Sequence, residues 1–393
     1  MRELDCSPAL HPLDAHGHPN PSASTGSSTA SAVSEAAKAL SQGFLVAFPT
    51  ETVYGLGADG LNCAAVARIF QAKGRPKGHP LILHAADLET ALKVSTQWSP
   101  LALGLANAFW PGPLTLILKK SDLVPSEVTG GQDSVGIRVP DQEIARRMLL
   151  AFAARGSGLV AAPSANRFGG VSPTRASDVL KGLGPFLRAE DCLLKAGDCP
   201  LGLESTIVDC RDSVPRLLRP GGLSRERLNA WLKANAFSLL QTPSARGEEL
   251  RVSGSLDYHY APRCPLLVWP RAQIEAFVQS DKALEDHGLA ELTALNVPNL
   301  PNRAEGLKLG LLLLEARAAW AFVSASSDAL RPPMFNIDLQ VLASEPEAYA
   351  RQFYRCLNDW DGKGTGLILV ESPPQTAAWE AIWDRLRRAS SKR

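Results

Sequence analysis

The stretch LVAAPSANRFGGVSP, residues 159–173, places a short apolar run directly before a polar loop. The apolar run 159–162 predicts a buried strand, and the tetrapeptide PSAN at 163–166 begins the loop. In open α/β sheets, ligands commonly bind just beyond the carboxyl ends of strands. Ser and Asn there offer neutral hydrogen-bonding groups, but they equally suit a plain turn with Asn in the left-handed conformation. Taken alone, the stretch leaves the two interpretations balanced.

Strand and helix patterns alternate on both sides of this stretch. Short apolar runs predict strands, and apolar positions three or four residues apart predict helices. Such alternation over residues 31–240 is typical of one α/β domain. The segment 49–57 is rich in polar residues and Gly, and it is predicted to be a loop. The predicted strands are 44–48, 80–84, 114–118, 135–139, 159–162, 206–209 and 216–218, and the predicted helices are 32–42, 64–72, 143–154 and 225–232.

The rest of the chain predicts a tail, a linker and a second domain. A length of 393 residues exceeds the roughly 100–200 of one domain. Residues 1–30 are rich in Pro, Ser, Thr and Gly, so they are predicted to be disordered. Residues 241–263 have few aliphatic side chains and are predicted to be a linker that ends in HYAP, 259–262. Residues 264–393 predict a smaller, Rossmann-like α/β domain with strands 266–269, 320–323 and 366–370 and helices 272–284, 347–360 and 377–388.

The composition excludes several classes of protein. Lys plus Arg is 41 and Asp plus Glu is 40, and a net charge of +1 argues against a basic nucleic-acid coat and an acidic disordered protein. No apolar run reaches the 18 or so residues of a membrane span. The seven cysteines are scattered and form no C-x-x-C pair, so neither a disulfide framework nor a zinc finger is expected. The N-terminus does not resemble a secretory signal, and we expect a cytoplasmic protein.

Local charge is less even than the total. Three windows, 60–86, 144–177 and 213–225, contain cations but no carboxylate, which suggests that they bind an anion such as phosphate. Lys73 and Arg75 lie in a loop bracketed by Gly and Pro, where function is the favoured interpretation. Arg146 and Arg147 lie on a predicted helix, where a solvated face is favoured.

No familiar nucleotide or hydrolase motif is present. The chain lacks the P-loop pattern, the protein-kinase motifs, H-E-x-x-H and a nucleophile elbow. The Gly cluster at 362–366 precedes a predicted strand, so it is interpreted as a tight turn. Any nucleotide would therefore be bound by scattered Arg, Lys, Ser and Asn side chains.

Six ordered motifs together resemble the YrdC-like family. The sequence HYAP and the second α/β region resemble the long, two-domain form of L-threonylcarbamoyladenylate synthase, with a departure at 253–258, SGSLDY. The resemblance implies a twisted, open, mixed sheet followed by the smaller domain. The motifs are FPTETVYGLG at 48–57, KGRP with PL at 73–81, WPGPLT at 110–115, APSAN with SPT at 162–174, GLEST at 202–206 and LRPG at 218–221.

The resemblance also implies a reaction. Such enzymes combine L-threonine, bicarbonate or CO2, and ATP, release pyrophosphate, and form L-threonylcarbamoyladenylate for the threonylcarbamoyladenosine modification of tRNA. The carbamate of threonine would attack the α-phosphorus of ATP, a step that needs positioning and charge stabilisation more than a nucleophilic residue. Mg²⁺ is expected with ATP, mainly on phosphate oxygens and water. The product would pass to the machinery that transfers it to tRNA, and direct tRNA binding is left open.

The matching positions imply roles for individual residues. Arg138 would face the threonine carboxylate, and Lys73 and Arg75 are expected to be catalytic. The residues implied to bind L-threonine are Thr52, His84, Ser134, Arg138, Ala162 and Ser205. The residues implied to bind ATP are Lys73, Arg75, His79, Ser164, Asn166, Ser172, Arg219, Tyr258, His259 and Tyr260.

Two alternatives belong to other classes. A YrdC-like fold with a basic surface could bind RNA without catalysis, and the basic C-terminal tail permits that. A carbamoyltransferase role, as in hydrogenase-maturation proteins, would be accompanied by zinc-finger motifs, and none is present.

Overall fold

The computed structural model describes residues 1–6, 27–242, 250–254, 259–279, 307–314 and 335–391. Contacts divide the chain into two compact units. The first comprises Met1–Phe168 and Ser172–Ser255, and the second comprises Gly169–Val171 and Leu256–Arg393. The division falls inside the segment that is predicted to be a linker. Among the helices of the described residues, none is both long enough and apolar enough to cross a membrane.

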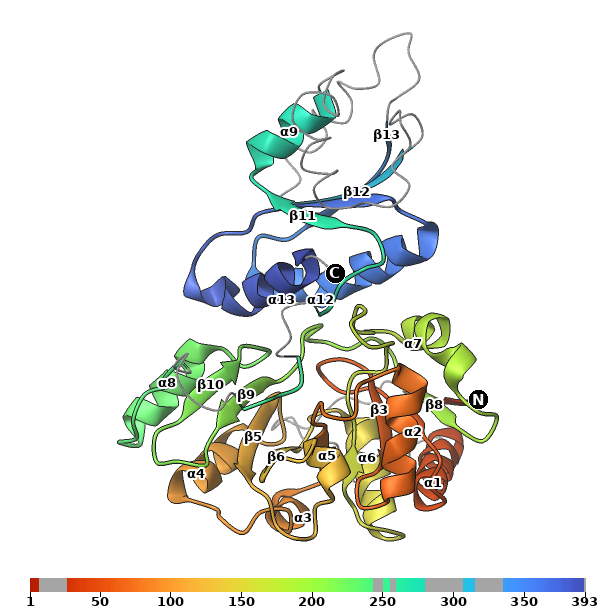
Figure 1. The fold of residues 1–393 in the computed structure, drawn as a ribbon, viewed down its shortest axis with the longest axis vertical. Coiled ribbons are helices and arrows are strands. Elements are labelled where there is room, and N and C mark those ends of the chain that lie inside the picture. The colour runs from red at the N-terminus through yellow and green to blue at the C-terminus, as the bar shows by residue number, and fades with distance from the viewer. Residues whose placement is uncertain (7–26, 243–249, 255–258, 280–306, 315–334, 392–393) are drawn as a thin grey trace. The chain divides into compact units, whose positions relative to one another are not determined.

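The first unit is built on one mixed sheet of ten strands (Figure 1). The central strand β4 is parallel to β6, which is antiparallel to β5, and β5 is parallel to β9. Strands β4 and β6 carry three of the six residues that the sequence assigns to threonine, namely His84, Ser134 and Arg138, and Ser205 directly precedes β9. In spatial order the strands are β1 (Arg2–Asp5), β8 (Cys192–Lys195), β2 (Val46–Phe48), β3 (Gly55–Asp59), β7 (Val160–Ala161), β4 (Ile82–His84), β6 (Ser134–Arg138), β5 (Leu114–Lys119), β9 (Thr206–Asp209) and β10 (Arg216–Arg219).

Helices cover both faces of this sheet. One face packs against α2, α4 and α8 in the larger apolar cluster. The other face packs against α1 and α6, which lie side by side (Figure 1). The helices are α1 (Ser27–Ser41), α2 (Cys63–Lys73), α3 (Leu88–Leu92), α4 (Pro100–Phe109), α5 (Ser126–Thr129), α6 (Glu143–Ala153), α7 (Ala176–Gly182), the 3-10 turn η1 (Gly184–Phe186) and α8 (Arg225–Ala234).

The face under α1 and α6 is covered in two different ways. Over β2 and β7, apolar side chains such as Phe48 and Val160 pack against the two helices. Over β5 and β9, Ile117 and Ile207 pack instead against Val252, from the segment Leu250–Ser253. A helix presents a mostly apolar stripe to a sheet, whereas this short segment leaves space for polar side chains. The candidate site lies on this half of the face.

The prediction of a loop over residues 49–57 is wrong for residues 55–57, because β3 begins at Gly55. Strand β3 is antiparallel to β2 on one side and to β7 on the other. A Cβ atom on Gly57 would lie 2.7 Å from Val160 Cγ1 and 2.9 Å from the Phe48 ring. Glycine at this position therefore reflects close packing in a sheet, not a turn.

The predicted disordered tail is wrong at both of its ends. Residues 2–5 form β1, which pairs in parallel with β8, and α1 begins at Ser27. Strand β1 is held by backbone hydrogen bonds, which require no apolar side chain. The composition of residues 1–30 therefore gives no sign of it.

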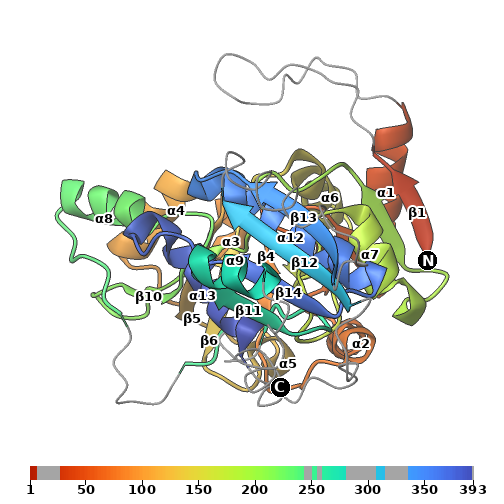
Figure 2. The same ribbon diagram turned by 90° about the horizontal axis from the view of Figure 1, so that it is seen from above.

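The second unit contains four parallel strands in the order β11, β14, β12, β13 (Figure 2). The helix α9 lies on one side of them, and α12 and α13 lie on the other (Figure 1). Strands β12 and β13 were not predicted, and the predicted strand 320–323 lies outside the described residues. The elements are β11 (Leu266–Trp269), α9 (Arg271–Gln279), β12 (Leu307–Leu314), β13 (Phe335–Leu342), α12 (Pro346–Lys363), β14 (Leu367–Glu371), η3 (Ala377–Trp379) and α13 (Glu380–Ser390).

Candidate active site

Arg138, at the carboxyl end of β6, lies at the centre of the first group of site residues. Its side chain is only 4% exposed. Its Nε donates to the Gly112 carbonyl oxygen at 3.2 Å, and its Nη1 donates to Thr52 Oγ1 at 3.0 Å. The register of β4 and β6 places His84 beside it. Thr52, His84 and Arg138, distant in sequence, therefore meet at one end of the central strands.

Ser205 extends this group across β5 to β9. Its hydroxyl lies 2.8 Å from Thr115 Oγ1. Arg219 donates from Nη2 to the Ser205 carbonyl oxygen at 2.8 Å and to its hydroxyl at 3.2 Å. Another nitrogen of the same guanidinium, Nη1, donates to the Ser253 carbonyl oxygen at 2.8 Å. Arg219 is 3% exposed, and among the described residues its hydrogen-bond partners are neutral oxygens.

His84 is neutral at ordinary pH. It is 4% exposed, and its Nδ1 lies 3.3 Å from the Ile82 carbonyl oxygen. Burial, together with the positive charge of Arg138, lowers the pKa of His84 from 6.5 to about 3. A neutral imidazole adds hydrogen-bonding capacity to the site without adding charge.

Lys73, at the end of α2, is buried below the PSAN loop. Its ammonium group donates to the carbonyl oxygens of Ser164 and Asn166. Complete burial, with Arg75 and Arg167 nearby, lowers the pKa of Lys73 well below its usual value. An anion close to this group would raise that pKa again, because an opposite charge favours the ammonium form.

Arg75 and His79 flank the same loop. Arg75 is 6% exposed, and its Nη2 donates to the Pro80 carbonyl oxygen at 2.9 Å. Its guanidinium lies 5.6 Å from the centre of the Phe168 ring, and the His79 ring lies 5.3 Å from the same ring. Partial burial and the charges of Arg75 and Arg251 lower the pKa of His79.

Side-chain hydrogen bonds hold the loop after β7. Ser164 Oγ donates to Asn166 Oδ1 at 2.5 Å. Ser172 is fully buried, and its hydroxyl donates to Glu204 Oε1 at 2.6 Å. Glu204 directly precedes Ser205, so this bond connects the loop to the residues that are assigned to threonine.

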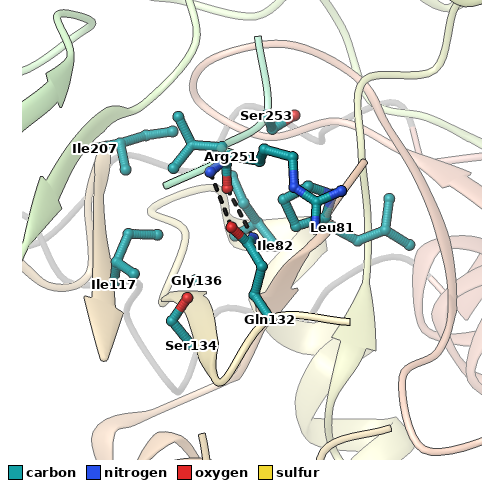
Figure 3. A pocket seen from close by; sticks show the side chains of 11 residues that line it. Leu81, Ile82, Ile117, Gln132, Ser134, Gly136, Ile207, Arg251 and Ser253 are labelled. Atoms are coloured by element: carbon teal, nitrogen blue, oxygen red, sulfur yellow. Dashed lines mark hydrogen bonds between the residues drawn. The ribbon is translucent and has the colours of Figure 1, made fainter. Parts of the chain in front are cut away.

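A small cavity lies on the same sheet face, under the segment Leu250–Ser253 (Figure 3). Ser134, assigned to threonine, lines it together with Gly136. Gln132 closes its rim by two hydrogen bonds to the Arg251 backbone, at 2.9 and 3.0 Å. Ala162 lines no such space, and its N–H donates to the Ile82 carbonyl oxygen at 2.9 Å.

The HYAP residues lie in the second unit. Tyr258 falls outside the described residues. His259 and Tyr260 are 6% and 1% exposed, and their rings lie 4.0 Å apart. The Tyr260 ring stacks on Tyr354 at 5.9 Å, with the Arg385 guanidinium 4.9 Å from its centre. Nucleotide contacts from these residues remain a prediction.

Glu51 is a buried site residue to which the sequence assigned no role. It is 5% exposed, and its Oε1 lies 2.6 Å from Arg138 Nη2. The distance is that of an ion pair, but neither carboxylate oxygen nor Nη2 has a partner in hydrogen-bond geometry. The only sequence signal is its place within FPTETVYGLG. Thr115, which bonds to Ser205, was also missed although it ends WPGPLT.

The cations of the three windows differ in their partners. Several pair with carboxylates on other elements, such as Arg68 with Asp191 and Arg216 with Asp209. Arg147 pairs with Glu143 on its own helix, which agrees with the prediction that it lies on a solvated helix face. Lys73 and Arg219 are instead buried on neutral oxygens. Excess buried positive charge favours an anionic ligand at these two positions.

Two family models match consecutive parts of the chain. The Sua5_yciO_yrdC model, described as "Telomere recombination", matches residues 38–221. The model described as "Threonylcarbamoyl-AMP synthase, C-terminal domain" matches residues 223–391. Every described site residue from Thr52 to Arg219 lies within the first match.

Curated proteins and solved structures give the same result. The chain is 36% identical to the threonylcarbamoyl-AMP synthase of Pyrococcus abyssi, over 91% of this chain and 94% of that protein. It is 33% identical to the protein of the same name from Bacillus subtilis, over 92% and 93%. The crystal structure of P. abyssi Sua5 complexed with L-threonine matches with a TM-score of 0.72 and 32% identity, over 92% and 94% of the two chains. The predicted fold class is therefore confirmed.

Proposed function

This chain belongs to the threonylcarbamoyl-AMP synthase family, and on that basis we propose that it makes L-threonylcarbamoyladenylate from L-threonine, bicarbonate or CO2, and ATP, with release of pyrophosphate. The observation that carries the proposal is the meeting of Thr52, His84, Arg138 and Ser205 at one end of the central strands. These residues combine one fixed cation with neutral hydroxyl and imidazole groups. That set suits a small amino acid with a carboxylate and a hydroxyl.

The proposal assigns the triphosphate to the buried cations. Arg219 adjoins the threonine group through Ser205, and Lys73 adjoins the nucleotide loop through Ser164 and Asn166. Charge-assisted hydrogen bonds to phosphate are about twice as strong as neutral ones. Arg75 and His79 are proposed to act beside Lys73. Ser164, Asn166 and Ser172 are proposed to hold the nucleoside by neutral hydrogen bonds.

The chemistry follows from these positions. The α-ammonium group of threonine first gives up a proton to solvent and becomes an amine. The amine nitrogen then forms a bond to the carbon of CO2 and loses a second proton to solvent, which leaves a carbamate. A carbamate oxygen then attacks the α-phosphorus of ATP, and the bond to the β-phosphate oxygen breaks with loss of pyrophosphate. The residues contribute by holding the carbamate in line with the phosphorus and by stabilising the charge that develops. Neither step requires a covalent bond to the protein.

Mg²⁺ enters the proposal only as the counter-ion of ATP. Among the described residues, no group of three or more His, Cys, Asp and Glu side chains could hold a metal ion. Mg²⁺ bound by phosphate oxygens and water needs no cage of protein ligands.

The product and the location complete the proposal. The mixed anhydride is reactive, so it is expected to pass to a second enzyme that transfers the threonylcarbamoyl group to tRNA. A cytosolic location is proposed because all seven cysteines are free thiols. Fractionation of cells would test the location directly.

The deciding experiment measures pyrophosphate release by the purified chain. Release is expected to require threonine, bicarbonate and ATP together, and omission of any one should abolish it. Mass spectrometry should find threonylcarbamoyl-AMP in the complete reaction. Equal ATP turnover without threonine would refute the proposal.

A non-catalytic RNA-binding role is the other candidate, and no observation of the site favours it. Such a role would not need a buried threonine-type group. It predicts tRNA binding that weakens steeply with salt and no pyrophosphate release.

A further inference from the structure

Glu51 and Arg138 bury opposite charges side by side at the threonine end of the site. They are 5% and 4% exposed. Glu51 Oε1 lies 2.6 Å from Arg138 Nη2, yet both carboxylate oxygens and Nη2 lack an aligned hydrogen-bond partner. A buried polar atom without a partner is costly, so natural structures rarely leave three of them together.

A purely structural ion pair in the same unit has a different geometry. Asp191 accepts two hydrogen bonds from Arg68 Nη2, at 2.8 and 2.9 Å, and two more from the backbone N–H groups of Leu45 and Arg188. Arg138 is already oriented without Glu51, because Gly112 and Thr52 accept from its Nε and Nη1. The need to orient Arg138 therefore does not explain why a carboxylate is buried beside it at position 51.

The atoms without a hydrogen-bond partner indicate the chemistry of the ligand. Glu51 requires hydrogen-bond donors with positive charge, and Arg138 Nη2 requires an acceptor with negative charge. The α-carbon of an amino acid carries an ammonium group and a carboxylate, which have these two signs. A phosphate would satisfy Arg138 but leave Glu51 without a donor, and a hydroxy acid would offer Glu51 only a neutral hydroxyl donor without the positive charge.

We propose that Glu51 binds the α-ammonium group of the amino-acid substrate while Arg138 binds its carboxylate. The inference rests on the proposed function and extends it to the reacting atom, because the α-nitrogen is the one that takes up CO2. In the ligand-free protein the two side chains neutralise each other. Binding replaces that contact by two ion pairs to the zwitterion, so the buried charges stay balanced.

The test compares two ligands that differ only at the α-position. Calorimetric titration of the full chain uses L-threonine and (2S,3R)-2,3-dihydroxybutanoate, in which a hydroxyl replaces the amine. The wild-type protein should prefer threonine. Glu51→Gln should weaken threonine binding about 10- to 100-fold, the range for a lost hydrogen bond to a charged group. It should weaken binding of the hydroxy acid much less, because the hydroxyl offers Glu51 only a neutral hydrogen bond. Glu51→Asp should keep part of the preference, and the exposed Glu127→Gln is the matched control.

Equal losses for both ligands would show that Glu51 acts through Arg138 and would overturn the inference, as would unchanged threonine binding. Melting temperature and ATP affinity report whether Glu51→Gln is folded. If it is not, the wild-type protein still decides, because equal binding of the two ligands contradicts a site for the ammonium group. Pyrophosphate release by the wild-type protein is measured separately, so failure of the proposed function is recognised on its own.

Discussion

The ammonium group of Lys73 donates a hydrogen bond to the carbonyl oxygen of Ser164, 91 residues further along the chain. A second bond, to the Asn166 carbonyl oxygen, holds the other side of the same turn. Lys73 thus determines the shape of the loop to which the nucleotide contacts are assigned. An ammonium group has three donors, so one remains for a phosphate.

Lys73→Met should raise the KM for ATP at least about tenfold, because the loop loses two charge-assisted bonds and the phosphate loses a cation. The melting temperature should change little, since removal of a buried charge offsets the lost bonds. Steady-state pyrophosphate release and thermal melting measure the two effects. Lys77→Met, at an exposed position nearby, should change neither, and normal kinetics in Lys73→Met would contradict the role.

Arg219→Gln should lower kcat/KM for both substrates by about 100-fold, since Arg219 joins Ser205 to Ser253 and is proposed to face the triphosphate. Arg216→Gln, on the same strand but with its side chain 38% exposed, is the control. Kinetics with each substrate varied in turn will separate the effects. A change in kcat/KM for threonine alone would contradict the assignment of Arg219 to the triphosphate.

His84 makes the folded protein sensitive to acid. The unfolded chain binds a proton at His84 below pH 6.5, whereas the folded protein does so only near pH 3. Protons therefore favour the unfolded state as pH falls through this window, at about 1.4 kcal/mol per pH unit. Urea unfolding between pH 7 and about 4 should show a smaller loss for His84→Gln than for the wild-type protein. Identical slopes would mean that His84 is not buried as a neutral group.

Asp191→Asn should lower the free energy of unfolding by about 3 kcal/mol, because it leaves Arg68 without its charged partner. Asp191 is fully buried and lies outside the site, so the KM values of the folded variant should match those of the wild-type protein. Chemical unfolding and steady-state kinetics test the two halves. Altered KM values would connect this ion pair to the site.

Two truncations separate the roles of the linker segments. A chain that ends at Arg246 lacks Arg251–Ser253, and it should lose most activity because Arg219 and Val252 lose their contacts. A chain that ends at Ser255 keeps those contacts but lacks HYAP. We expect it to be folded by thermal melting yet impaired in turnover. Full activity of either chain would refute the part assigned to the missing segment.

Strands with continuous apolar runs could be predicted from sequence because burial on both faces leaves a strong local pattern. Residues 206–209 form β9 as predicted. By contrast, GLGAD at 55–59 is a strand because two neighbours pair with it, and the local sequence has the composition of a turn. Strand β12 was not predicted although it contains a short apolar run, 309–314, and its partners β13 and β14 lie later in the chain.

The roles of single site residues could likewise be predicted only in part, because they depend on contacts between distant segments. Thr52 and Ser205 lie in the motifs 48–57 and 202–206, whereas His84 and Arg138 lie outside all six and were named from the family resemblance as a whole. That the four residues meet depends on strand order. Glu51 could not be distinguished from a surface carboxylate, because burial of one charge against another is decided by distant segments. The nucleotide contact expected of Tyr260 stays a prediction; in the structure its ring stacks on Tyr354 and lies beside Arg385 and His259.

Because the first few residues form strand β1, changes at the N-terminus are expected to disturb the sheet. Arg2–Asp5 occupies the outermost place in the ten-stranded sheet, beside β8. A shortened chain that begins at the first helix would leave the backbone groups of β8 open to strand addition by another molecule, a known route to aggregation. A purification tag is therefore better attached at the other end, and self-association of the shortened chain in light scattering would reveal the exposed edge.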